Sequence, residues 1–248
     1  MIRYKTAQQI KDMREGGKRL AESLQVVVEA TKPGITTQEL DEVAAKAISE
    51  RGGKPSFLGY EGFPKTLCAS INQEVVHGIP SRERVVQAGD IIGLDLGLWY
   101  KGLCTDMAVT IPVGKVSKIA KKLLKVTKKS LQIAIEQARP GNTTGDIGYA
   151  VQKYAESHGF GVVRDLAGHG VGLEVHESPL VLNYGQAGSG EVLKPGLVIA
   201  IEPMLTVGDY RVKTLADNWT IETIDGSLAA QFEKTLAITA DGPVVLTE

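Results

Sequence analysis

The sequence is poor in the residues that would indicate a special environment. Only two cysteines, Cys68 and Cys104, occur in 248 residues, which excludes a disulfide framework and favours a reducing compartment such as the cytoplasm. Aromatic residues make up only 5%, and no apolar run approaches membrane-spanning length. Charged residues stand where a signal peptide would have its apolar stretch. We therefore expect a soluble, unprocessed, monomeric protein without a membrane partner.

Charge of neither sign is in excess. The 28 lysines and arginines nearly balance the 29 aspartates and glutamates, so a net charge of −1 gives the chain no general attraction to nucleic acid. Seven lysines between Lys115 and Lys129 are the one basic feature. Their spacing is typical of the solvent-facing side of a helix, and contact with nucleic acid stays open as the less favoured alternative.

An internal repeat organises the chain. KPGITTQEL at 32–40 matches RPGNTTGDI at 139–147, and GDIIGLD at 89–95 matches GLVIAIE at 196–202, each 107 residues later. Gly52 and Gly159, suited to helix C-termini, are also 107 residues apart. This register predicts two related halves, about 1–113 and 114–248, that form one pseudo-symmetric domain. Functional residues are expected where the halves meet.

Each half is expected to begin with helices and continue with strands. Apolar spacing predicts helices over 7–30 and 116–138, each followed by a Thr-Thr pair whose second threonine caps another helix. Stretches rich in Val, Ile, Leu and Thr predict strands at 66–76, 91–99, 104–112, 197–207, 219–224 and 233–239. Helices that lead and antiparallel strands that follow indicate the α+β class.

Carboxylates interrupt the apolar pattern of the strands. Asp95 and Asp106 stand in IIGLDLGLW and LCTDMAVTI, and a hairpin turn at Tyr100 and Lys101 would place them directly opposite each other. Such a pair repels unless it is protonated or bridged by a cation. Taken alone, two edge-strand aspartates that face water would be equally compatible with the sequence.

The second half supplies matching groups. Glu202 occupies the place of Asp95 in the repeat, and Glu233 roughly that of Asp106. Four carboxylates that converge by pseudo-symmetry predict a pair of divalent ions, to which transition metals would add imidazole. His77, His169 and His176 lie in turns or at strand ends near these strands and are the candidates, whereas His158 belongs at a helix C-terminus.

The ordered set Asp95, Asp106, His169, Glu202 and Glu233, with LCASINQEVVHGIP before it and WTIETIDGSLAAQFEKT near the end, resembles the type I methionine aminopeptidases over almost the whole chain. The resemblance implies the pita-bread fold, an α+β domain of two pseudo-symmetric halves. It also implies two divalent metal ions of cobalt, manganese, iron or zinc. Asp95 and Asp106 would bind one ion, His169 and Glu202 the other, and Asp106 and Glu233 would bridge them.

The same resemblance implies roles in catalysis and substrate binding. His77, His176 and Glu202 would be catalytic, and the two histidines would also contact substrate. Tyr60, Phe63, Cys68 and Trp219 would form a pocket for a methionine side chain. The implied activity is removal of the N-terminal methionine from nascent polypeptides and peptides with a small second residue. A transient contact with the ribosome through the lysine-rich helix, without specific nucleic-acid recognition, belongs to the same expectation.

Two features leave alternatives open. The stretch GHGVGLEVHESP also occurs in proline-specific aminopeptidases of the same fold, and Val175 stands where many methionine enzymes have Phe. Lys234 replaces a histidine that is common after the last glutamate. A proline-specific enzyme and a non-enzymatic pita-bread binding protein are therefore the alternative interpretations.

Overall fold

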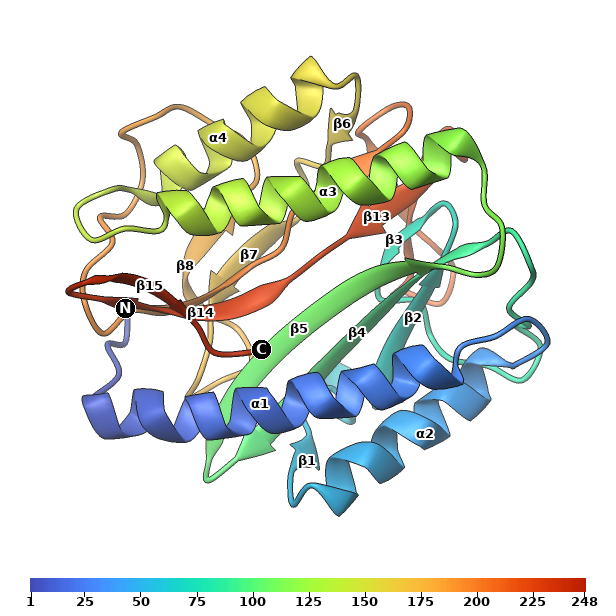
Figure 1. Ribbon diagram of the computed structural model, residues 1–248, viewed down its shortest axis with the longest axis horizontal. Coiled ribbons are helices and arrows are strands. Elements are labelled where there is room, and N and C mark those ends of the chain that lie inside the picture. Colours follow the sequence, from blue (N-terminus) through green and yellow to red (C-terminus); the bar gives the residue numbers. More distant parts are fainter.

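Two pairs of helices flank a central set of antiparallel strands (Figure 1). The computed structural model describes residues 1–248. The first pair is α1 (Ala7–Ala30) with α2 (Thr37–Glu50), and the second is α3 (Lys118–Gln137) with α4 (Thr144–Ser157). α2 and α4 begin and end 107 residues apart, as the repeat predicts. The α+β class and the two pseudo-symmetric halves are confirmed. None of the helices is long and apolar enough to cross a membrane.

Fifteen strands form four small sheets. Each half contains an equivalent group of three paired strands. In the first half β4 pairs with β2 and β5, and in the second half β9 pairs with β7 and β14. The strands are β1 (Lys54–Pro55), β2 (Leu67–Ile71), β3 (Glu74–Val76), β4 (Ile91–Tyr100), β5 (Leu103–Pro112), β6 (Gly161–Val162), β7 (Ala167–Gly170), β8 (Glu177–Leu182), β9 (Val198–Ile201), β10 (Met204–Thr206), β11 (Val212–Thr214), β12 (Ile221–Thr223), β13 (Ala229–Gln231), β14 (Lys234–Thr239) and β15 (Gly242–Val245).

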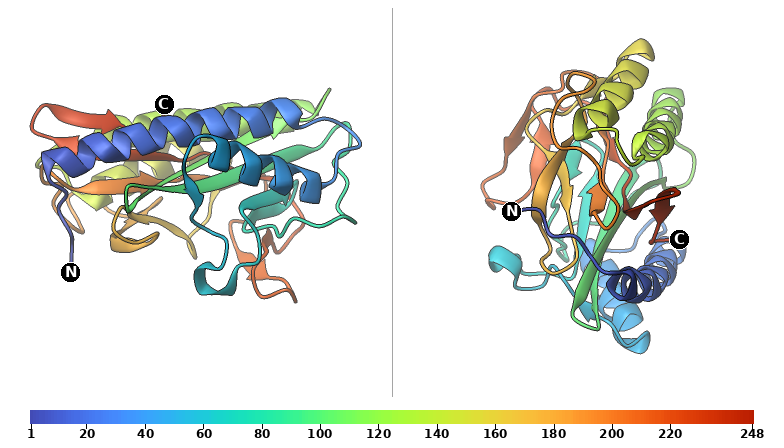
Figure 2. Two further views of the ribbon diagram at one scale, coloured as in Figure 1. Left: turned by 90° about the horizontal axis from the view of Figure 1, so that it is seen from below. Right: turned by 90° about the vertical axis from the view of Figure 1, so that its left-hand side faces the viewer.

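The helices cover one face of the strands, and loops occupy the other. Figure 2 shows α1 and α3 along one side, while the short helix η1 (Tyr60–Gly62) and the β11–β12 hairpin project from the opposite side. Alternation within β4 explains this arrangement, because Leu94, Leu96 and Leu98 pack into the apolar cluster of α1 and α2. Asp95, between two of these leucines, therefore faces the loop side.

The helix caps differ from the prediction in one detail. The first threonine of each pair, Thr36 or Thr143, is the N-cap, and the second already lies within the helix. A capping box needs a side chain that can accept a hydrogen bond three positions after the cap, and only the first threonine of each pair has one, Glu39 or Asp146. Gly52 and Gly159 have positive φ just beyond the two helices, as predicted.

Two predicted strands are broken and one hairpin has a different register. The 66–76 stretch turns at Asn72, whose φ is positive, and the 197–207 stretch stops between Ile201 and Met204. The β4–β5 turn is formed by Lys101 and Gly102, both with positive φ, so Asp95 is paired with Ala108 and Asp106 with Gly97. Two-residue hairpins favour such a turn, and Gly102 suits it better than Tyr100. The shift of two residues keeps both aspartates on one face.

The contribution of the Thr36 cap to stability can be measured by substitution. Thr36→Ala removes the hydroxyl that accepts from the Glu39 backbone N–H, so we expect unfolding free energy to fall by about 1 kcal/mol in urea denaturation. Thr36→Ser keeps the hydroxyl and should retain most of that stability. Equal losses in both variants would show that the methyl group, not the cap, matters.

Candidate metal centre and substrate cleft

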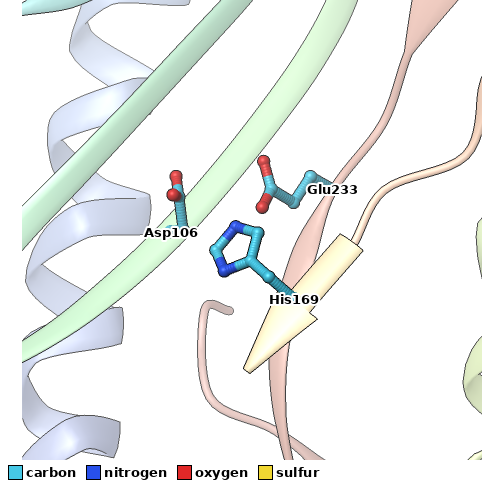
Figure 3. A group of neighbouring side chains, drawn as sticks. All are labelled: Asp106, His169 and Glu233. Atoms are coloured by element: carbon cyan, nitrogen blue, oxygen red, sulfur yellow. The ribbon is translucent and has the colours of Figure 1, made fainter. Parts of the chain in front are cut away.

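Residues from both halves meet around one cavity of about 140 Å³. Ligand atoms of Asp106, His169 and Glu233 lie within 4.8 Å of one another, and their side chains point toward a common centre (Figure 3). Asp95 and Glu202 line the same cavity, so the structure brings together all five residues that the resemblance assigned to metal.

Strand pairing sets the position of these residues. Asp95 lies in β4 and Asp106 in β5, while Glu202 directly follows β9 and Glu233 directly precedes β14. The Glu233 backbone N–H donates to the Ala108 carbonyl at 2.9 Å, which joins β5 of the first half to the second half. His169 lies within β7, not in a turn as predicted, because its Gly-rich surroundings pair with β8 and β9.

Electrostatics make this cluster unfavourable without a cation. Burial raises the pKa of Asp95 to about 7. Burial, followed by the nearby carboxylates, raises the pKa values of Asp106, Glu202 and Glu233 well above their usual range. No lysine or arginine lines the cavity. A bound divalent ion would reverse these shifts and stabilise the ionised carboxylates.

The donor atoms fit a divalent metal. Asp95 Oδ1 is buried and has no hydrogen-bond partner, as expected of an oxygen that faces a cation. The His169 Nδ1–H donates to the Gly170 carbonyl at 2.8 Å, which leaves Nε2 as the free acceptor, 3.7 Å from Glu202 Oε1. Burial lowers the pKa of His169 to about 3, so its imidazole is neutral and able to ligate.

Two amide side chains that sequence reasoning missed hold Glu202. Gln231 Nε2 donates to Glu202 Oε2 at 3.1 Å, and Asn183 Nδ2 donates to the Glu202 backbone carbonyl at 3.0 Å. Both amides are buried. The sequence shows Gln231 only as an amide in an apolar stretch before Glu233, and it gives no sign that Glu202 is the partner.

The predicted substrate residues form the other walls of the cavity. His77, His176, Tyr60, Phe63, Cys68 and Trp219 all line it. Phe63 and Trp219 meet edge to face at 5.1 Å between ring centroids, and the Tyr60 hydroxyl lies 3.1 Å from His176 Nδ1. Burial lowers the pKa of His77 to about 4 and lowers that of His176, so both imidazoles are neutral at pH 7.

Phe57, Val175 and Lys234 differ in their positions relative to the cavity. Phe57 also lines the cavity and was missed, although it is one of only four phenylalanines. Val175 is buried in the same apolar cluster as Phe63 and Cys68 but does not itself line the cavity. Lys234 points away, since its Nζ donates to the Thr247 carbonyl.

A larger cleft of about 590 Å³ adjoins the cavity. The two share His77, His169, His176 and Glu202, so the carboxylate cluster is reached from this open side. Met1 and Arg3 of the chain's own N-terminal segment line the cleft. The remaining predicted features lie elsewhere: His158 is the C-cap of α4, as expected, and the lysines of α3 are exposed.

Comparison with known proteins matches this geometry. The model of metallopeptidase family M24 matches residues 11–240. A methionine aminopeptidase of Clostridium acetobutylicum is 49% identical over 247 residues, covering 100% of this chain and 99% of that one. The crystal structure of methionine aminopeptidase from Thermotoga maritima superposes with a TM-score of 0.98 at 43% identity, covering 100% of both chains. The prolidase of Pyrococcus horikoshii reaches 0.81 at 25% identity, covering 99% of this chain but 63% of its own.

The buried carboxylates predict a pH-dependent response to metal. Their folded-state pKa values are raised, so protonation stabilises the fold at low pH and this contribution is lost as pH rises, through about 7 for Asp95. Chelator-treated protein should therefore lose stability from pH 5 to 8. Manganese at a fixed concentration, about 100 times its Kd at pH 8, should raise the unfolding temperature by about 5 to 10 °C at pH 8 and less at pH 5, where protons compete for the carboxylates.

Thermal unfolding with EDTA or manganese across that pH range measures this effect. Asp95→Asn should flatten the pH dependence, whereas Asp241→Asn, at an exposed turn, should leave it unchanged. An equal gain from metal at both pH values would contradict the electrostatic account.

Proposed function

The chain belongs to metallopeptidase family M24, and we propose that it is a methionine aminopeptidase that removes the N-terminal methionine from peptides and nascent polypeptides. The observation that supports this most directly is a single cavity with buried carboxylates and His169 on one wall and apolar rings on another. The first wall suits hydrolytic chemistry, and the second suits a thioether side chain. The open cleft beside it leaves room for the rest of a peptide.

As a metallopeptidase the chain binds divalent metal, and we propose a site for two ions. Asp95 with Asp106 would hold one ion, His169 with Glu202 the other, and Asp106 and Glu233 would be shared. Metal bound there would polarise the scissile carbonyl and lower the pKa of a water molecule so that a nucleophile forms near neutral pH. Oxygen and imidazole donors of this kind suit cobalt, manganese, iron and zinc alike.

Glu202 is the residue we assign to proton transfer. Its carboxylate faces the cavity, and Gln231 fixes one oxygen at 3.1 Å, which leaves the other oxygen directed toward His169 and the reacting atoms. With metal bound, the ionised Glu202 carboxylate would accept a proton from water and return it to the departing amine. Gln231 and Asn183 act as positioning residues in this step.

The two cavity histidines would contact the peptide bond from different elements. With the Tyr60 hydroxyl donating to Nδ1 of His176, the Nε2 carries the proton and can donate to the oxyanion that forms on the first carbonyl. His77 follows β3 and would hydrogen-bond the nitrogen of the bond that breaks. Both rings are neutral, so neither competes with metal for the carboxylates.

The choice of methionine over proline-specific cleavage follows from the apolar wall and from the relatives. Full-length identity of 49% is to a methionine aminopeptidase, whereas the prolidase has 25% identity and a longer chain. We propose that a small second residue is favoured. The exposed lysines of α3 would offer a surface for transient contact with the ribosome.

Replacing the histidines separates substrate contacts from metal ligands. His77→Ala and His176→Ala should each reduce kcat for Met-Ala-Ser by about 10² to 10⁴ while the protein keeps its bound metal. Asp106→Ala serves as the contrast, because it should lose both activity and metal. Steady-state kinetics with metal analysis tests this, and loss of a metal equivalent from His176→Ala would overturn its assignment.

Substrate preference tests the methionine assignment. Met-Ala-Ser should be cleaved well, a norleucine peptide should be tolerated, and Leu-Ala-Ser and Ala-Pro-Ala should be poor substrates under the same metal conditions. A methylene-sized change in an apolar pocket discriminates only about 10- to 200-fold, so the contrast with norleucine should be modest. Preference for Ala-Pro-Ala would reverse the assignment and leave the metal centre untouched.

A further inference from the structure

A buried ion pair joins the start of the chain to the wall of the cleft. Lys5 Nζ lies 2.6 Å from Glu177 Oε2, and the two side chains are only 1% and 2% exposed. Lys5 precedes α1 and Glu177 begins β8, so the contact spans 172 residues. Neither residue belongs to the cavity of the carboxylate cluster. This pair is therefore a separate polar feature that the proposed chemistry does not use.

Lys5 is held in place along its whole length. Its backbone N–H donates to the Gly196 carbonyl at 2.7 Å, and its Nζ also donates to the Arg3 carbonyl at 3.2 Å. Its stem fills the space beside Gly172, where a Cβ would lie 2.5 Å from Lys5 Cε. Gly172 has a φ of +141°, so both its conformation and this contact favour glycine.

Glu177 uses its second oxygen to organise the loop that carries His176. Oε1 accepts hydrogen bonds from the backbone N–H groups of Leu173 and Glu174, at 2.6 and 3.1 Å. His176 is the next residue in the chain before Glu177, and its ring lies 4.3 Å from that of His169 between centroids. One carboxylate therefore links Lys5 to the backbone on both sides of the catalytic imidazole.

Stability alone does not account for a pair of this kind. Removing two charges from water costs free energy that their attraction only partly returns, and apolar residues of similar size often stabilise a fold equally well. The nearby Arg3–Glu174 pair, with side chains 45% and 56% exposed, connects the same two segments and contributes little. Glu177 directly follows His176 in the chain, so the buried pair is placed to fix the position of that imidazole.

We propose that Lys5 is a positioning residue that acts through Glu177 to hold the His176 imidazole at the angle needed to meet the substrate carbonyl. The proposal deepens the proposed function and rests on it. It also assigns a role to the segment before α1, which becomes part of the wall of the cleft. A displacement of about 1 Å at a catalytic group can reduce a rate by about 100-fold, so even a small loop shift would be measurable.

Lys5→Met tests the proposal with Met-Ala-Ser as substrate. It should lower kcat by about 10- to 100-fold, with little change in KM or bound metal, and Lys5→Arg should restore most of the rate. Lys101→Met is the matched control, because it breaks two ion pairs, to Asp12 and Glu15 of α1, at a residue that lines neither the cavity nor the cleft, and its kcat should be unchanged. If Lys5→Met fails to fold, the Lys5→Met/Glu177→Gln double variant removes both charges, keeps an oxygen for the loop N–H groups, and should show the same loss.

Coupling to His176 distinguishes positioning from a general structural role. In a His176→Ala background the Lys5 substitution should cost less than about twofold further, because the group it positions is gone. The proposal would be overturned if Lys5→Met lowered kcat by the same factor in both backgrounds, or if Lys5→Met kept full activity. Wild-type cleavage of Met-Ala-Ser would still support the proposed function in either case.

Imidazole NMR signals give a readout that is independent of activity. Those of His176 should shift in Lys5→Met while those of His158, the C-cap of α4, stay in place. Unchanged His176 signals would refute the proposal even if the wild-type enzyme proved inactive on methionyl peptides, a result that would refute the proposed function separately.

Discussion

Mutual repulsion among four carboxyl groups, three of them buried and that of Glu202 only 12% exposed, is the constraint on which the rest of this structure depends. Each neighbour raises the pKa of another, and burial raises them all. Such a cluster is tolerable only when protonation or a cation compensates the charges and when the surrounding backbone cannot relax. The leucines on either side of Asp95 supply that rigidity, since they are fully buried against the helices while Asp95 faces the cavity. A single strand thus joins the apolar core to the charged centre.

Pseudo-symmetry explains how the charges are brought together. Asp95 and Asp106 belong to the first half, and His169, Glu202 and Glu233 to the second. A bridge between Val109 and Phe232 places β5 beside the approach to β14, and neither half alone holds the complete set of proposed ligands. Two copies of one element order, 107 residues apart, therefore produce a site that depends on the contact between them.

Sequence patterns predicted the parts of this protein that depend on local rules. Helix periodicity predicted both ends of α1, and carboxylates within apolar strand patterns indicated the charged centre. The hairpin register failed because it depends on which residues accept positive φ, and Gly102 was the overlooked signal. The Lys5–Glu177 pair and the Gln231 contact could not be predicted, since they join residues far apart in sequence whose types carry no shared periodicity.

Trp219, in the wall of the proposed methionine pocket, is connected through paired strands to His77, which would contact the scissile peptide bond. Trp219 precedes β12, and β12 pairs with β3, which leads directly to His77. The Thr220 hydroxyl also faces the His77 carbonyl at 3.5 Å, and the rings of His77 and Trp219 are 6.1 Å apart. A residue that fills the apolar pocket therefore packs against the same small sheet that carries His77. Loops beside a rigid scaffold change more readily than its strands. A substitution of Trp219, in the loop before β12, can therefore alter side-chain preference without moving the carboxylates. Trp219 and His77 thus adjoin a sheet that carries none of the proposed metal ligands, whereas Cys68, on another wall of the pocket, lies in β2 and pairs directly with Asp95 in β4.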